Sequence, residues 1–499
     1  KLGKTAALFS AACYMFAPYL VSMVAAGHEG KIYVAALFPL TMLFLDRAFE
    51  TKPFLNFTIL GMVLGIMILS PHPQMSYFTS WAVGLYTLFK LAVLWRNGKQ
   101  FRLIFKPALL TGYAAVLALL LSAIQFYPGY AYTTTFSARV DRESSWNWAT
   151  SWSMHEEEAF SQLIPEFPGT MFPRLPQSGL NEEPANYWGK NHFKDHSDSV
   201  GVAAIFLSLL GIALVKRKET LFFGALATFA FIYALGATTP VYKLFYWLIP
   251  KVNLLRAPGM IMFIFSFSIA LLAGWGVQAV IDLRQNGSVF AKSFLRILLF
   301  GFPACMLLLA VSFSLLGKEM LSLWMFFFHS NAGTTVVREG VSKFDLALLN
   351  LSEIQLGAWV AFLTTLFAAS LIWLYIKGKV GFAVLSLLIL LPIVNGVRFN
   401  ERFINTVDLQ TYFEPSGLIK FLKAQEGEFR VLSLSRGIPK SILPQFDIEL
   451  VTGYHGNQLR WYDDLLGGPH FKNRSNPRFL NLVGTRYVII PASSRLKED

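Results

Sequence analysis

The sequence predicts an α-helical polytopic membrane protein with about eleven transmembrane helices and a small α/β domain outside the membrane. Composition is the first reason. Of 499 residues, 54% are hydrophobic and only 15% are charged, against roughly 25% charged residues in soluble domains. The second reason is that apolar runs of membrane-spanning length, or slightly shorter, recur along most of the chain.

The apolar runs give the number and orientation of the expected helices. We place them at 5–26, 32–45, 54–69, 75–95, 107–127, 199–215, 220–236, 258–281, 294–316, 354–376 and 379–394. Some are short enough to require tilt or local thinning of the bilayer. Basic residues gather in alternate short loops, which the positive-inside rule assigns to the cytoplasm. These residues are Lys1, Lys4, Arg47, Lys52, Arg96, Lys99, Arg102, Lys106, Lys216, Arg217, Lys218, Arg284, Lys292, Arg296, Lys377 and Lys379.

All other connections face outward under this topology. They are 27–31, 70–74, the long loop 128–198, the loop 237–257, the segment 317–353 and the tail from residue 395. The unusual polar motifs "GHEGK", "SPHPQ" and "LLRAPG" all fall in these connections. Structural turns would not favour one face of the membrane, so this clustering favours a functional site at the outer surface.

The chain divides into a transmembrane domain at 1–394 and an extracytoplasmic α/β domain at 395–499. In the tail, helical stretches at 415–427 and 476–484 alternate with strand-like stretches at 429–435 and 485–491, as in a small α/β domain. The chain starts close to its first apolar run and stops just after a strand-like stretch. We therefore expect a fragment that lacks both ends, with an incomplete C-terminal domain.

The two long outward connections carry structural signals of their own. In 128–198, Trp146, Trp148 and Trp152 are typical of an aromatic belt at headgroup level. Ser153 followed by Glu156 predicts a capping box that opens a short helix. In 317–353, "LSLWMFFFHS" predicts an interfacial segment rather than another span, because it is short and flanked by polar sequence.

Composition also excludes several classes of protein. Cys13 and Cys305 lie in apolar segments far apart in the sequence, which excludes a disulfide framework and a cysteine-based zinc site. The net charge is +13, but the basic residues lie mostly in short loops, so we expect no nucleic acid as a partner. The histidines near the outer face match no known metal-ligand spacing, so we predict no metal site. The need for a divalent cation as cofactor stays open.

The loop "GHEGK" carries His28, Glu29 and Lys31 between two apolar runs. A lysine can neutralise a phosphate, a histidine can carry a proton, and a glutamate can accept one from a hydroxyl nucleophile. A solvated turn, with Lys31 reaching toward the interface, explains the same residues at least as simply.

Two further motifs lie on the same predicted face. "SPHPQ" holds His72 between two prolines that stiffen the backbone, and Gln74 follows; a proline at a helix end without any chemistry is the alternative. "LLRAPG" puts Arg256 at the outer end of a long helix, with Pro258 in its first turn and Gly259 allowing close approach. The guanidinium suits a lipid-linked phosphate or, alternatively, ordinary lipid headgroups.

The loop 128–198 is rich in aromatic rings, acids and imidazoles. Aromatic faces beside carboxylates suit carbohydrate recognition. We therefore take Gln74, Glu156, Trp188 and His192 as candidate sugar or acceptor contacts. The run of three glutamates at 156–158 is more typical of a solvated helix face, with at most one member reaching into a site.

The order and spacing of six segments resemble the YfhO-like family of bacterial multi-spanning membrane proteins, placed in the GT-C superfamily of membrane glycosyltransferases. The segments are "GHEGKIYVAALFPL", "SPHPQMSYF", "AFSQLIPEFPG", "NYWGKNHFKDHSDSVGVAAIFLSLLGI", "LLRAPGMIMF" and "NPRFLNLVGTRYVII". Together they run over nearly the whole chain, and the piece "YWGKNHF" followed by "VGVAAIFL" is the most distinctive.

The resemblance implies a GT-C-like enzyme of the bacterial cytoplasmic membrane that transfers a sugar from a polyprenyl-phosphate donor to an extracytoplasmic cell-envelope glycan. An acceptor hydroxyl would attack the anomeric carbon while the lipid phosphate leaves. Lys31 and Arg256 would bind the phosphate, while His28 and His72 would position groups or carry protons. Glu29 is the best local carboxylate, and Trp188 would close over the sugar. The principal acid of such enzymes usually lies in the first outward loop, which we expect to precede this sequence.

A transporter and a non-catalytic envelope assembly or binding protein are the alternative functions. A transporter predicts charged groups or broken helices near the bilayer midplane, and related halves of the sequence. The predicted helix interiors are almost free of charge and no repeat is present. An assembly protein could use the same outer face without turnover, and the sequence does not distinguish it from an enzyme.

Overall fold

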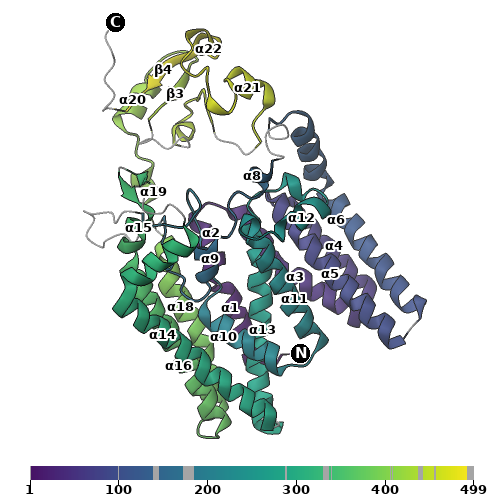
Figure 1. The fold of residues 1–499 in the computed structure, drawn as a ribbon. Coiled ribbons are helices and arrows are strands. Elements are labelled where there is room, and N and C mark those ends of the chain that lie inside the picture. Colours follow the sequence, from purple (N-terminus) through teal and green to yellow (C-terminus); the bar gives the residue numbers. More distant parts are fainter. Residues whose placement is uncertain are drawn as a thin grey trace. The chain divides into compact units, whose positions relative to one another are not determined.

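The computed structural model describes residues 2–98, 100–138, 145–171, 185–286, 289–329, 336–338, 340–404, 406, 408–435, 442–453 and 457–491. Lys1 and Lys99, two of the predicted cytoplasmic basic residues, lie outside them. The chain separates into two compact units, drawn in Figure 1. The first consists of Lys1–Ala123 and Trp146–Asn405, and the second of Ile124–Ser145 and Thr406–Asp499. We describe each unit by itself.

The first unit is almost entirely helical. Its helices are α1 (Lys4–Met15), α2 (Pro18–Ala25), α3 (Glu29–Glu50), α4 (Pro53–Leu69), α5 (Pro73–Gly98), the first part of α6 (Phe101–Thr135), α8 (Trp146–Ala149), α9 (Glu156–Phe160), α10 (Val202–Leu214), α11 (Lys218–Ala234), α12 (Tyr242–Leu248), α13 (Met262–Asn286), α14 (Val289–Phe328), α15 (Lys343–Leu349), α16 (Leu351–Ile376), α17 (Phe382–Leu385) and α18 (Leu390–Asn400). A short 3-10 helix, η3 (Pro258–Ile261), leads into α13, and the strands β1 (Val336–Arg338) and β2 (Val341–Ser342) pair antiparallel.

Each of the eleven predicted apolar runs coincides for most of its length with helical structure. Eight stretches among the described residues are long and apolar enough to cross a membrane. They are Lys4–Ala25, Glu29–Glu50, Pro73–Gly98, Phe101–Thr135, Pro258–Arg284, Leu295–Phe328, Leu351–Ile376 and Phe382–Phe403. The helices α4 and α10 are shorter and apolar, and α11 has 17 residues. The chain is therefore a helical polytopic membrane protein, while the number of spans stays a prediction.

Two of the predicted segments have a different local form. The first run is divided, because α1 ends at Met15 and α2 starts at Pro18, whose ring cannot continue the hydrogen bonds of a preceding helix. The segment "LSLWMFFF" is the last part of α14, which continues through Phe328 after a kink at Leu316. The interfacial location predicted for 317–353 remains a prediction.

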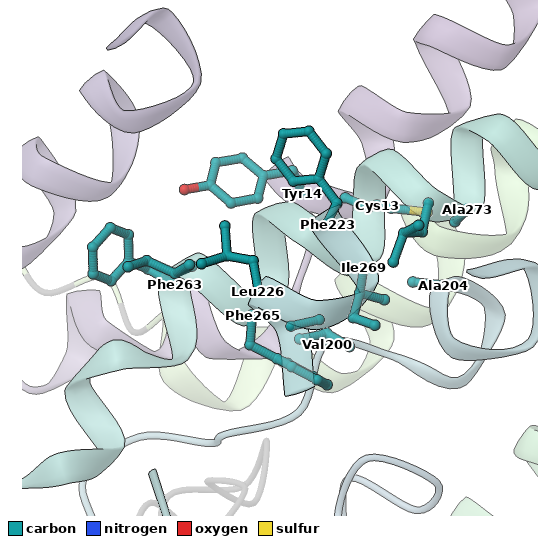
Figure 2. Close-up of a cluster of buried hydrophobic side chains, with 14 of the residues drawn as sticks. Cys13, Tyr14, Val200, Ala204, Phe223, Leu226, Phe263, Phe265, Ile269 and Ala273 are labelled. Atoms are coloured by element: carbon teal, nitrogen blue, oxygen red, sulfur yellow. The ribbon is translucent and has the colours of Figure 1, made fainter. Parts of the chain in front are cut away.

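The core of the first unit surrounds α13, most of which is buried. Figure 2 shows side chains from α1, α10, α11 and α13 packed into one apolar cluster. Close approach of α10 and α13 depends on two glycines. A Cβ atom at Gly211 would lie 2.1 Å from the carbonyl oxygen of Leu272, and one at Gly276 would lie 2.1 Å from that of Leu207. The two backbones therefore touch where side chains would otherwise separate them.

The second unit combines the end of α6 with α19 (Leu409–Tyr412), α20 (Gly417–Lys423), β3 (Arg430–Ser433), α21 (Arg460–Leu465), α22 (Pro477–Leu482) and β4 (Thr485–Ile489). β3 and β4 pair in parallel. The two helical and two strand-like stretches predicted in the tail are therefore present. The contact boundary lies after Asn405 rather than after residue 394, because α18 continues to Asn400 and packs on α1 and α2.

Candidate functional site

A buried ion pair lies in the segment that leads into α10. Lys194 Nζ is 2.7 Å from Asp198 Oδ2, and the side chains are 4% and 0% exposed. The amide of Gln162 donates to the Asp198 carbonyl oxygen at 2.7 Å, and the backbone N–H of Ser197 donates to Ser22 Oγ at 2.9 Å. Burial alone would raise the pKa of Asp198, but the adjacent Lys194 outweighs this effect and holds the pKa below its ordinary value. The pair is therefore charged and held in place.

Lys31 lies close to this pair without joining it. It is in the first turn of α3, is only 5% exposed, and forms no ion pair among the described residues. Its electrostatic neighbours are the cations Lys194 and Arg256 and the carboxylates Asp195 and Asp198. The site therefore contains a buried cation without a paired anion, an arrangement that costs free energy unless a ligand completes it.

Arg256 is held at its backbone carbonyl by a hydrogen bond and at its guanidinium by two aromatic rings. Gln74 Nε2 donates to the Arg256 carbonyl oxygen at 2.5 Å. The guanidinium carbon lies 4.6 Å from the ring centroid of Trp148 and 5.5 Å from that of Trp152. Cation–π contacts of this kind hold the plane of the guanidinium and leave its N–H edge for an acceptor. The two tryptophans predicted for a headgroup belt thus contact the arginine predicted for phosphate.

The turn after Arg256 lies against the buried ion pair. The backbone N–H of Ala257 donates to the Ser151 carbonyl oxygen at 2.9 Å. A Cβ atom at Gly259 would lie 3.5 Å from the Trp152 carbonyl oxygen and 3.9 Å from Lys194 Nζ. These are ordinary van der Waals distances, so the packing here does not require the glycine that the sequence predicts for close approach.

His28 lies at the edge of the cluster and is half-buried. Burial, and then the charges of Lys31 and Arg256, lower its pKa to about 4. The imidazole is therefore neutral at pH 7 and can donate or accept a hydrogen bond. Glu29 is exposed at the start of α3, outside the group formed by His28, Lys31 and Arg256.

His72 has a local structural role. Its Nδ1 accepts from the backbone N–H of Met75 at 3.4 Å, in the first turn of α5. The two polar loops do lie side by side, because a Cβ atom at Gly30 would be 3.0 Å from Pro71 and 3.4 Å from His72 Cβ. The structure therefore brings Gln74 to Arg256 but gives His72 a helix-capping contact.

The three glutamates of α9 do not form a solvated face. Glu156 pairs with Lys190 at 2.7 Å, whereas Glu157 and Glu158 are buried. Glu157 Oε1 accepts from Trp324 Nε1 at 2.9 Å and lies 2.7 Å from His329 Nε2. Glu156 is therefore held by Lys190, and its role as a sugar or acceptor contact stays a prediction.

Glu158 lies beside the ion pair of Lys194 and Asp198. Its Oε1 accepts from the Tyr187 hydroxyl at 2.5 Å, and burial raises its pKa to about 7. Its Oε2 accepts from the backbone N–H of His155 at 2.8 Å. The cap of this short helix therefore involves His155 and Glu158 rather than Ser153 and Glu156, and the prediction for the capping residues was wrong by two positions.

One aromatic prediction for the long loop also needs correction. Trp188 is fully buried, its Nε1 donates to the Phe167 carbonyl oxygen at 2.7 Å, and its ring packs on Phe167. It fills the core between the loop and α14, so its face is not offered to a sugar. His192 is exposed, and its role as a sugar or acceptor contact stays a prediction. The ring centroids of the neighbouring Phe193 and of Trp152 lie 5.4 Å apart.

Lys194, Asp195 and Asp198 belong to the site, although the sequence analysis did not single them out. Asp195 is partly exposed, and its pKa is raised by burial against the opposing charges of Lys31 and Lys194. The dense run of charged residues in "KDHSD" is the signal that could have drawn attention to them, although this segment is not helical.

The residues that the structure describes contain no group of three or more histidine, cysteine, aspartate or glutamate side chains arranged to hold a metal ion. Both cysteines are free thiols.

No protein-family model, curated protein or solved structure matches the chain. The resemblance to the YfhO-like proteins therefore rests on the sequence motifs alone.

Proposed function

We propose that the chain is a GT-C-like membrane glycosyltransferase of the YfhO-like kind, which moves a sugar from a polyprenyl-phosphate donor to an extracytoplasmic envelope glycan. One observation carries the proposal. Lys31, Lys194 and Arg256 converge, yet among the described residues only Lys194 is paired with an acid. A buried cation without a partner is costly, so the site suits an anion that arrives with the substrate. A phosphate supplies both the charge and the acceptor oxygens.

The arrangement suggests a role for each group. The N–H edge of Arg256 and the ammonium of Lys31 would stabilise the phosphate oxygen, which gains negative charge as its bond to the anomeric carbon breaks. The acceptor hydroxyl oxygen forms the new bond to that carbon, and its proton passes to a carboxylate. We favour Asp195 over Glu29 for this proton, because Asp195 is the partly exposed acid near Lys31 and Lys194.

Donor binding is the first test. The purified chain in lipid nanodiscs is labelled with a photoreactive C15 isoprenyl phosphate, with and without excess unlabelled isoprenyl phosphate. We expect saturable labelling that Lys31→Met and Arg256→Met each reduce at least about tenfold. Lys251→Met is the control, because this lysine is exposed in the same connection as Arg256. Equal labelling of all four proteins would refute the proposed donor site.

Turnover is the second test. Polyprenyl phosphate carrying radiolabelled glucose, mannose or N-acetylglucosamine is incubated with the protein and a cell-envelope glycan fraction. Transfer of the label to the glycan, lost in Arg256→Met, would support a transferase. Saturable donor binding without transfer of any of these sugars would overturn the enzymatic part of the proposal in favour of an assembly protein.

A further inference from the structure

Four exposed basic residues form a group at one end of the helices α13, α14 and α16. They are Arg284 near the end of α13, Arg296 in the first part of α14, and Lys377 and Lys379 in the turn that follows α16. In the sequence they belong to two separate loops. The structure brings these loops together, because Arg284 Nη1 donates to the Val380 carbonyl oxygen at 3.0 Å.

Two aromatic rings of α16 contact three of these cations. The guanidinium carbon of Arg284 lies 4.5 Å from the ring centroid of Tyr375. Lys377 Nζ lies 4.9 Å from the ring centroid of Trp373, and the guanidinium carbon of Arg296 lies 6.0 Å from the same centroid. Cation–π contacts restrict the positions of charged groups without using their N–H donors. Donors from three helices are therefore held around one pair of rings.

The charge of this group is not compensated by acids. Among the residues that the structure describes, none of the four cations forms an ion pair. Asp282 is close to Arg284 in the sequence, but residues two apart on a helix do not face each other, and Asp282 Oδ1 accepts from Gln278 Nε2 at 2.9 Å. The C-terminal ends of α13 and α16 each offset only about half an elementary charge. The group therefore suits an anion.

The position of the group along the helices indicates where this anion comes from. Three stretches that are long and apolar enough to cross a membrane have an end here, namely Pro258–Arg284, Leu295–Phe328 and Leu351–Ile376. The ends of apolar spans lie at the level of the lipid headgroups. Basic groups between helices at this level are suited to phosphate-containing headgroups.

Exposed apolar side chains lie next to the cations on α14 and α16. Ile297 and Leu374 are exposed, and so is Phe300, whose ring centroid lies 5.4 Å from that of Trp373. These side chains suit the acyl chains of a lipid whose headgroup contacts the cations. We infer that the group binds the headgroup of an anionic phospholipid, whose phosphate oxygens accept hydrogen bonds from Arg284, Arg296 and Lys377.

This lipid site is distinct from the proposed donor site. Arg256 precedes α13, whereas Arg284 lies near the other end of this helix. A helix of 25 residues is about 37 Å long at 1.5 Å per residue. The inference therefore does not depend on the proposed transferase activity.

Competition between anions tests the inference. The full chain in phosphatidylcholine nanodiscs receives a trace of phosphatidylglycerol with a diazirine in one acyl chain, and the peptides labelled on photolysis are mapped. We expect labelling of peptides that contain 295–300 or 371–380. Excess unlabelled phosphatidylglycerol should reduce it at least about fivefold, while soluble glycerol phosphate should not change it. Equal competition by glycerol phosphate would mean a site for soluble anions, and no competition by either would mean non-specific labelling. Either result would overturn the inference.

Two variants with the same change of charge separate a specific site from general attraction to the membrane surface. The test variant combines Arg284→Gln, Arg296→Gln and Lys377→Gln. The control variant combines Lys216→Gln, Arg217→Gln and Lys218→Gln, at residues that are also exposed and predicted for the cytoplasmic side. The test variant should reduce labelling at least about tenfold, and the control variant less than about twofold. Equal losses would refute a specific site.

A substitution that keeps every charge tests the aromatic contacts. Trp373→Leu removes the ring shared by Arg296 and Lys377, and should reduce labelling about threefold or more. Trp359→Leu is the control, because this tryptophan lies on the same helix and is 36% exposed; it should leave labelling unchanged. Melting temperature and elution volume report folding. A folded Trp373→Leu protein that labels like wild type would mean that charge alone attracts the lipid, and would overturn the inference.

Discussion

Lys31 offers a sharp test of the proposed donor site, because its contributions to binding and to the stability of the fold have opposite signs. Methionine keeps an unbranched side chain of similar length and removes the charge. Lys31 is only 5% exposed and forms no ion pair with any residue that the structure describes, and desolvation of an ion costs several kcal/mol. Asp195 and Asp198 offset part of this cost, while Lys194 and Arg256 add repulsion.

Repacking around methionine should cost less than about 1.5 kcal/mol. We therefore expect Lys31→Met to raise the free energy of unfolding by about 1–3 kcal/mol. The corresponding rise in the melting temperature is roughly 2–5 °C. The same variant should lose saturable labelling by the C15 isoprenyl phosphate, since the removed charge is the one that the phosphate would pair with.

Thermal unfolding in nanodiscs, followed by tryptophan fluorescence, measures the first effect. Lys190→Met is the matched control, because Lys190 pairs with Glu156 at 2.7 Å and its side chain is 27% exposed. Its loss should lower stability by less than about 1 kcal/mol. A lower melting temperature for Lys31→Met would mean that the fold already compensates this charge, and the reasoning for an anion site would fail.

Four further substitutions test individual positions. Gly357→Ala should destabilise the protein by about 2–4 kcal/mol, because its Cβ atom would lie 2.2 Å from a buried carboxylate oxygen. Gly224→Ala, where the site is open, should instead stabilise by about 0.5–1 kcal/mol; equal melting temperatures would contradict this. Glu158 has a raised pKa of about 7, so the stability that its bound proton provides is complete below pH 4.5 and is lost as the pH rises through 7. Glu158→Gln should remove up to roughly 3 kcal/mol of that pH dependence, and unchanged pH profiles would refute it. Trp188→Phe should cost about 1–2 kcal/mol through its lost hydrogen bond without changing donor labelling, whereas weaker labelling would restore a ligand contact for this ring.

The helices were predictable from the sequence because hydrophobic length is a property of each segment alone. The division of the first run at Pro18 and the continuation of α14 to Phe328 were less accessible. Both depend on local backbone geometry, which an apolar composition leaves undetermined. For Lys31 and Arg256, the sequence predicted a shared side of the membrane. It did not predict that the two residues lie close together.

The sequence pattern could not predict which of the acidic side chains are buried. A run of three glutamates on a short helix has the same appearance whether it faces water or a core. Glu157 and Glu158 are buried because His329, Tyr187 and Trp324 come to them from distant parts of the sequence. Trp188 is a second error of the same kind, since an aromatic residue in a polar loop can fill a core as readily as it can bind a sugar.

The reciprocal glycine contacts between α10 and α13 limit how the bundle can move. Sliding either helix by one turn, about 5.4 Å along its axis, would replace the glycine by a residue about four positions away, whose side chain would meet the carbonyl oxygen of Leu207 or Leu272. The close contact between the two helices therefore resists sliding of one along the other. If the first unit opens to admit a ligand, we expect the movement in elements outside this contact, such as the start of α3, which carries Lys31, and the segment that carries Arg256.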